Sequence, residues 1–420
     1  MILCLIASGA KAQFLQFTPV GGPESRPETA RDRLERELKE VPFQVGPVRV
    51  TPLVGLRDLA YVRNLFASGG EIESDLTVTA SAGFRAYLQT GRKVTWIAQA
   101  VPEYVWWAER EEARRLNLSY GLQTLALFNR LTVDVAASRV EQQRLLTPEV
   151  PQLVNAATDL GRFEVELEAT SALFPFATLR ASRQESLIDA DEDPRVQVIE
   201  RLDREERVAR AGVRWRPRPD FMLGLSAERS EADFDNEEFD SSNEGTAPVL
   251  EVLIDRQRLF FHADLAARSL EERKGSRFVA FDGVTGDVAL SFRPYATSRL
   301  EAWLYGSRNL AYSVAADSAY LDDRRIGTSV GWRAGQRLAF RAFAETGTND
   351  YAAFSPATPQ RKDDLTSFGG SVRLTIAGTL NLLVQAARIE IDSNIPGRDR
   401  SYSSGGLTFS LGGNLIGKNL

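Results

Sequence analysis

The stretch LTVTASAGFRAYL, residues 76–88, indicates an extended strand, because apolar side chains alternate along it with small or polar ones. One phase carries Leu76, Val78, Ala80, Ala82, Phe84, Ala86 and Leu88. The other carries Thr77, Thr79, Ser81, Gly83, Arg85 and Tyr87. A period of two gives an extended strand one apolar and one polar face. The alternation recurs over residues 163–169, 209–215, 221–228, 259–268, 326–333, 372–376 and 407–411. The sequence therefore predicts an all-β chain.

Composition narrows the class of protein. Among 420 residues there is one Cys, Cys4, and one His, His262, so a disulfide, a thiolate metal site or a site with two imidazoles is excluded. The net charge of −6 gives no basic excess for nucleic acid. No run of eighteen apolar residues is free of charge, which excludes a helical membrane protein. A soluble β-sandwich and a membrane β-barrel remain.

The spacing of the strand breaks separates these two folds. Tight turns are predicted at residues 89–93, 128–130, 173–176, 216–220, 254–258, 293–298, 333–337 and 376–380. Longer polar loops are predicted at residues 66–74, 107–114, 140–160, 185–204, 230–247, 270–277, 309–323, 346–364 and 391–400. These seventeen connections imply about 18 strands. The fold class predicted is a transmembrane antiparallel outer-membrane β-barrel with short periplasmic turns, long extracellular loops and both termini in the periplasm.

Aromatic residues beside the predicted turns support the membrane barrel. We expect an interfacial girdle made of Phe128, Phe174, Phe176, Trp215, Phe221, Phe292, Tyr295 and Trp332. Ordinary packing beside a turn would explain any one of these rings, but not their repetition.

The N-terminal region has a different texture. Residues 1–12 are predicted to be a signal peptide, possibly truncated at its start, that is cleaved after the small residues Ala10 and Ala12. Residues 13–42 form a periplasmic segment in which Ala30, Leu34 and Leu38 recur at helical spacing, so a short amphipathic helix is expected. That helix either caps the barrel end, or acts as a plug or as a contact in the periplasm. Residues 43–420 form the barrel.

At residues 43–66, FQVGPVRVTPLVGLRDLAYVRNLF, the chain resembles the first strand of the outer-membrane β-barrel family called beta-barrel porin type two. The matching positions are Gly46, Pro47, Pro52, Tyr61, Asn64 and Phe66. The resemblance implies an outer-membrane barrel associated with exopolysaccharide export, with a periplasmic polysaccharide export protein as its partner. One departure is the C-terminus: such barrels usually end in Phe or Trp, and this chain ends in Leu420.

If the apolar phase faces lipid, the polar phase lines the lumen. The candidate lumen residues are Arg85, Glu164, Glu166, Glu168, Arg210, Arg214, Glu228, Glu251, His262, Asp264, Arg268, Arg325, Arg341, Glu345 and Arg373. A lumen of both signs suits polar or charged solutes and argues against strong selectivity for one ion. Lumen aromatics, Tyr87, Phe260, Trp303 and Phe343, are few and scattered along the sequence.

Two loops and one histidine invite more specific interpretations. Apolar residues in the 140–160 loop, namely Leu145, Leu146, Val150, Leu153 and Val154, predict a constriction folded into the bore or over its mouth; a loop packed on its neighbours is the alternative.

The acidic residues Asp233, Asp235, Glu237 and Glu244 have roughly calcium-loop spacing, but Glu238 replaces the required Gly. A solvated acidic loop is therefore favoured and no metal site is expected. His262 and Asp264 share a face, and we interpret them as a hydrogen-bonded lumen pair rather than a catalytic base.

The functional hypothesis is an outer-membrane channel, a conduit for polysaccharide export, with no enzymatic activity and no cofactor. The alternatives are a general diffusion porin for small polar solutes, and a closed barrel that acts as an adhesin or interaction protein through its outer loops. The partners expected in every case are outer-membrane lipid and lipopolysaccharide, and none is nucleic acid.

Overall fold

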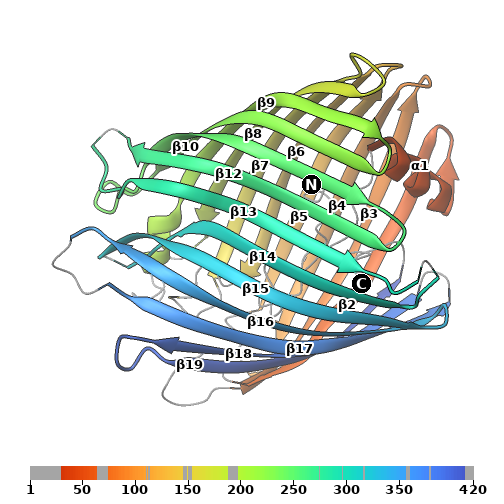
Figure 1. The fold of residues 1–420 in the computed structure, drawn as a ribbon. Helices are drawn as coiled ribbons and strands as arrows, with labels where there is room; N and C mark the ends of the chain where they lie inside the picture. The colour runs from red at the N-terminus through yellow and green to blue at the C-terminus, as the bar shows by residue number, and fades with distance from the viewer. Residues whose placement is uncertain are drawn as a thin grey trace.

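A closed antiparallel β-barrel of 18 strands forms the body of the protein, which confirms the predicted fold class. The computed structural model describes residues 30–63, 74–109, 111, 114–144, 149, 154–187, 197–273, 275–295, 297–315, 317–355, 360–377 and 380–411. The predicted signal peptide lies outside these residues. Within them, no helix has the length and apolar character needed to cross a membrane. Figure 1 shows the strands running obliquely around the closed wall.

The elements follow one another as a simple meander. In chain order they are α1 (Ala30–Glu40), β1 (Phe43–Val45), β2 (Val48–Arg63), β3 (Ser74–Thr90), β4 (Val94–Trp107), β5 (Arg115–Leu127), β6 (Leu131–Arg144), β7 (Val154–Leu167), β8 (Leu173–Ser186), the 3-10 helix η2 (Val198–Leu202), β9 (Arg204–Arg218), β10 (Phe221–Phe234), β11 (Asn243–Asp255), β12 (Leu259–Glu272), β13 (Phe281–Phe292), β14 (Leu300–Tyr312), β15 (Ser318–Ala334), β16 (Leu338–Ala353), β17 (Lys362–Ala377), β18 (Leu380–Ser393) and β19 (Arg400–Leu411). Each strand from β2 to β19 pairs with its sequence neighbours, and β19 pairs with β2 to close the ring.

The two ends of the barrel differ, as the sequence predicted. Short turns, such as 91–93 and 335–337, join the strands at one end, hereafter the turn end. Long connections, such as 187–203 and 235–242, join them at the other, the loop end. The short strand β1 doubles back on the start of β2 at the turn end, through a turn in which Gly46 has a φ of +59°. That left-handed conformation suits glycine, and the following Pro47 supplies its fixed φ.

The two faces of each strand follow the alternation read from the sequence. In β3, Leu76, Phe84 and Leu88 are exposed on the outer wall. Their neighbours Thr77 and Thr79 are fully buried on the inner wall. Large apolar side chains are likewise exposed on the outer wall of many other strands, where a bilayer would cover them. The barrel therefore buries its polar face and exposes its apolar face, the reverse of a soluble sandwich.

Candidate functional site in the bore

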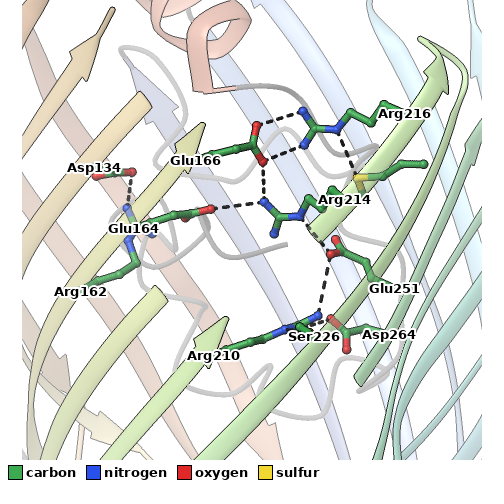
Figure 2. A network of polar contacts seen from close by, with 11 residues as sticks. Asp134, Arg162, Glu164, Glu166, Arg210, Arg214, Arg216, Ser226, Glu251 and Asp264 are labelled. Carbon is green, nitrogen blue, oxygen red and sulfur yellow. Dashed lines mark hydrogen bonds and ion pairs between the residues drawn. The ribbon is translucent and has the colours of Figure 1, made fainter. Parts of the chain in front are cut away.

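A network of charged side chains crosses the inner wall of β7, β9, β11 and β12 (Figure 2). Its centre is Arg214 on β9, whose Nη1 donates to Glu166 Oε2 at 2.8 Å and whose Nε donates to Glu251 Oε2 at 3.1 Å. Glu164 Oε1 lies 3.6 Å from the same guanidinium. One buried arginine thus holds carboxylates from two strands, β7 and β11, that are not neighbours in the sheet.

The network continues along the bore through two further arginines. Arg210 Nη1 donates to Asp264 Oδ2 at 3.1 Å, and its Nε donates to Ser226 Oγ at 2.8 Å. Arg216 donates through both terminal nitrogens to the carboxylate of Glu166, at 3.0 Å each. Bidentate and charge-assisted contacts of this kind fix side chains in place. The wall therefore presents fixed charges of both signs rather than mobile ones.

A second buried pair extends the network toward β6. Arg162 Nη2 donates to Asp134 Oδ2 at 2.7 Å, and both side chains are 3% exposed. Gln123 also donates to Asp134. The sequence analysis did not single out Asp134 or Arg162, although both fall on the polar phase of their strands.

The structure places the predicted strand residues of the lumen set on the inner face, but it pairs them selectively. Arg268 donates to Glu228 at 2.7 Å, and Arg325 Nη1 lies 3.8 Å from Glu345 Oε1. Arg341 and Arg373 lie on the same face of β16 and β17 and are diagonal neighbours, because Arg341 is opposite Ser371 and Arg373 is opposite Ala339. Glu168 follows the end of β7 and lies in the turn.

His262 does not form the predicted pair with Asp264. Its Nδ1 lies 3.4 Å from Asp287 Oδ2 on β13, while Asp264 is held by Arg210. The register explains the difference, since Asp264 lies opposite Asp287 and His262 lies one step along the same face.

Six of the eight predicted girdle aromatics lie at the turn end on or beside the outer wall. Phe128, Trp215, Phe292, Tyr295 and Trp332 are exposed, and Phe221 packs edge-on against Trp215. Trp332 stacks on Phe340 with ring centroids 5.4 Å apart.

Phe174 and Phe176 are different, because they point into the bore. Phe176 is 5% exposed, and its ring centroid lies 4.0 Å from the guanidinium carbon of Arg214. Phe174 lies 4.5 Å from that of Arg216. The predicted turn at 173–176 is wrong: the turn is 168–172, and β8 already begins at Leu173. Phe174 and Phe176 are therefore strand residues on the inner face of β8, not residues of a turn.

At the turn end, α1 packs against the inner wall of β3, β4 and β5. Leu34 is buried against Tyr87, Ile97 and Leu125, all inward-facing side chains. Tyr87 Oη donates to Glu37 Oε2 at 3.1 Å, and Arg85 Nη1 lies 3.7 Å from Glu37 Oε1. The helix therefore covers part of the bore lining at this end, and Figure 1 shows it there.

At the loop end, Glu149 reaches across the barrel mouth. It belongs to the connection between β6 and β7, yet its carboxylate accepts hydrogen bonds from Ser313 Oγ at 2.7 Å and from the Val314 amide at 2.8 Å. Those two residues join β14 to β15, almost opposite on an 18-stranded ring. Arg400 on β19 also donates to the backbone oxygen of Glu149, at 3.1 Å.

An apolar cluster lies beside this crossing. Val154 is 2% exposed and packs with Ile199 and Leu202 of η2 and with Val314. Arg201 Nη1 donates to the Val314 carbonyl at 2.8 Å. Two connections from one side of the ring thus meet the 313–315 segment over the mouth. The other constriction candidates, Leu145, Leu146, Val150 and Leu153, lie outside the described residues.

Asp203, at this end of the barrel, is a titratable group with a shifted pKa. Burial raises the pKa of Asp203, which follows η2, to about 6. Hydrogen bonds from the Ser186 amide and hydroxyl oppose that rise because they favour the ionised form.

The acidic residues with calcium-like spacing do not converge. Asp233 pairs with Arg273 at 2.8 Å, Asp235 with Arg183 at 3.5 Å, and Glu244 with Arg229 at 3.2 Å. Glu237 is exposed. In the part of the chain that the structure describes, no three of the His, Cys, Asp and Glu residues form a metal-binding group.

Comparison with known proteins identifies the fold. No family model matches the chain, and no curated protein matches it significantly. Among solved structures, Pseudomonas aeruginosa OpdO is 14% identical, with a TM-score of 0.51, over 86% of this chain and 96% of that one. A BenF-like porin from Pseudomonas fluorescens Pf-5 is 10% identical, with a TM-score of 0.53, over 88% and 99%. Pseudomonas aeruginosa OccK2 (OpdF), in complex with glucuronate, is 13% identical, with a TM-score of 0.51, over 86% and 98%. The chain therefore has the β-barrel fold of these porins.

Proposed function

We propose that this chain is a diffusion channel of the bacterial outer membrane for small polar or charged solutes. The observation that carries the proposal is the fixed inner-wall network around Arg214, in which three arginines and four carboxylates face the bore. Fixed charges of both signs can replace part of the hydration shell of a polar solute and let it pass without strong preference for one ion.

The two unlike ends of the barrel support a proposal for its orientation in the membrane. Short turns are periplasmic and long loops extracellular in outer-membrane barrels. By that rule we propose that α1 lies in the periplasm and the Glu149 crossing lies at the outer mouth. The exposed apolar wall faces outer-membrane lipid, and ion pairs above it, such as Arg139 with Asp159, face lipopolysaccharide.

The polysaccharide-export hypothesis is a weaker second candidate. An extended polymer, delivered by a periplasmic export protein, would need a passage wide enough for a chain along the whole bore. Val154 and the η2 residues Ile199 and Leu202 pack against Val314 at the loop end, and α1 covers part of the bore lining at the turn end. Both features favour small solutes.

The test is solute uptake into proteoliposomes that contain the refolded chain. Glucose and glucuronate have nearly equal size, and glucuronate adds one carboxylate that arginine can bind. We expect both to enter and glucuronate uptake to fall in the Arg214→Gln variant. Entry of neither solute would refute the proposal.

A further inference from the structure

Three aromatic side chains that looked scattered in the sequence lie in one row on the inner wall. Phe260 on β12 is opposite Ser291 on β13, which is opposite Trp303 on β14. Trp303 is opposite Ser329 on β15, which is opposite Phe343 on β16. Residues directly opposite each other project from the same face of a sheet. The aromatic row (Phe260, Trp303 and Phe343) therefore alternates ring, serine, ring, serine, ring.

The serines and a glycine let the rings lie along the wall. Ser291 and Ser329 are buried, so they leave little side chain between neighbouring rings. The centroids of Phe260 and Trp303 are 5.5 Å apart. Beyond Phe343 the next residue in the row is Gly369, where a Cβ would lie 2.8 Å from Phe343 Cζ. The ring of Phe343 thus lies over the glycine backbone, and both it and Trp303 stay partly exposed to the bore.

The aromatic row climbs into the bore from the turn end. Counted from the strand starts at that end, Phe260 is the second residue of β12, Trp303 the fourth of β14 and Phe343 the sixth of β16. Because each pair of residues advances a strand by roughly 6–7 Å, the row runs obliquely along the path of a solute rather than around one level.

Polar groups flank the rings. Glu301, two residues before Trp303 and on the same face, accepts from Ser291 Oγ at 3.2 Å and from Arg293 Nη2 at 3.0 Å. Arg341, two residues before Phe343, donates to Ser329 Oγ at 3.3 Å. Ring faces therefore alternate with side chains that can exchange hydrogen bonds with hydroxyl groups.

We propose that the aromatic row is a binding subsite for oligosaccharides. The face of an aromatic ring is electronegative, so it attracts the C–H groups on the flat side of a sugar ring, while the flanking Glu301 and Arg341 suit the hydroxyls at its edge. The backbones of Trp303 and Phe343 lie two strand spacings, about 10 Å, apart. That spacing suits a ligand of more than one sugar ring. The inference rests on the proposed function, which makes the row part of a solute path.

The experiment uses maltohexaose, a neutral probe that does not depend on the charged network. Its binding to the refolded chain is measured by block of the current in planar bilayers and by titration calorimetry in detergent micelles. The test variant is Trp303→Ala with Phe343→Ala. The matched control is Trp332→Ala with Phe340→Ala, which removes a stacked pair from the outer wall of β15 and β16.

The expected result is maltohexaose binding by both readouts, weakened about tenfold or more in the test variant and unchanged in the control. Equal binding by the test variant and the unmodified chain would overturn the inference, as would the absence of binding by the unmodified chain. The outcomes also separate the two proposals. Ion currents without sugar binding would support the diffusion channel and refute the subsite. Sugar binding without ion currents would refute the diffusion channel and show only that the barrel wall binds sugar.

Discussion

Replacing Glu149 tests whether the connection between β6 and β7 is held across the mouth. Its carboxylate accepts two hydrogen bonds, from Ser313 Oγ and the Val314 amide, and lies 3.9 Å from Arg361 Nη1. The Glu149 side chain is 3% exposed, so solvent screens these contacts little.

The size of the effect follows from those contacts. A hydrogen bond to a charged group contributes roughly 1.5–3 kcal/mol. Losing two of them in Glu149→Ala weakens the attachment by about 3 kcal/mol or more, which changes the ratio of attached to released forms about 150-fold. Arg361 keeps its pairing with Asp363, so the variant leaves no isolated buried charge there.

Single-channel recording in planar bilayers measures the consequence. We expect Glu149→Ala to show a larger mean conductance and more current noise than the unmodified chain, because the contacts of Glu149 with Ser313 and Val314 across the mouth are lost. The matched control is Glu141→Ala, on β6 just before this connection but on the outer wall, where it pairs with Arg139. Identical conductance and noise in Glu149→Ala and the unmodified chain would refute this account of the mouth.

Three further changes have defined outcomes. Arg214→Gln removes the central positive charge of the network, so the reversal potential in a salt gradient should shift toward cation preference; Arg207→Gln, on the outer wall, should leave it unchanged. Leu34→Asp places a charge in the apolar contact of α1 and should raise conductance, because the helix detaches from the wall. Glu35→Ala, on the exposed side of the helix, should leave conductance unchanged. Equal conductance of Leu34→Asp and the unmodified chain would show that α1 does not narrow the bore. Because the pKa of Asp203 is raised to about 6, the folded state binds its proton between about pH 4 and 6, and the η2 region should lose stability as pH rises through 6. Amide hydrogen exchange of η2 at pH 5 and pH 8 measures this, and Asp203→Asn should remove the difference.

The strand pattern could be predicted because it depends on local alternation alone. The phase of residues 76–88 fixes which side chains of β3 face inward, and no knowledge of partners is needed. The turn prediction failed at Phe174 and Phe176, because the proline between them, Pro175, is a residue type common in turns. The actual turn, residues 168–172, has no glycine or proline to mark it.

Features that depend on three-dimensional neighbours could not be read from the sequence. Glu149 and Ser313 are 164 residues apart, and no local signal links them. The pairing of His262 with Asp287 and the alignment of Phe260, Trp303 and Phe343 depend on strand register, which is set across several hairpins. The polar phase predicts which residues face the bore; register decides which of them meet.

Whether the barrel is an open channel is measured by the conductance of the refolded, unmodified chain in planar bilayers. A diffusion channel predicts discrete, stable current steps in potassium chloride, with weak preference between the two ions because both signs of charge line the bore. Insertion of the folded barrel with no current steps would contradict the claim and favour a closed barrel.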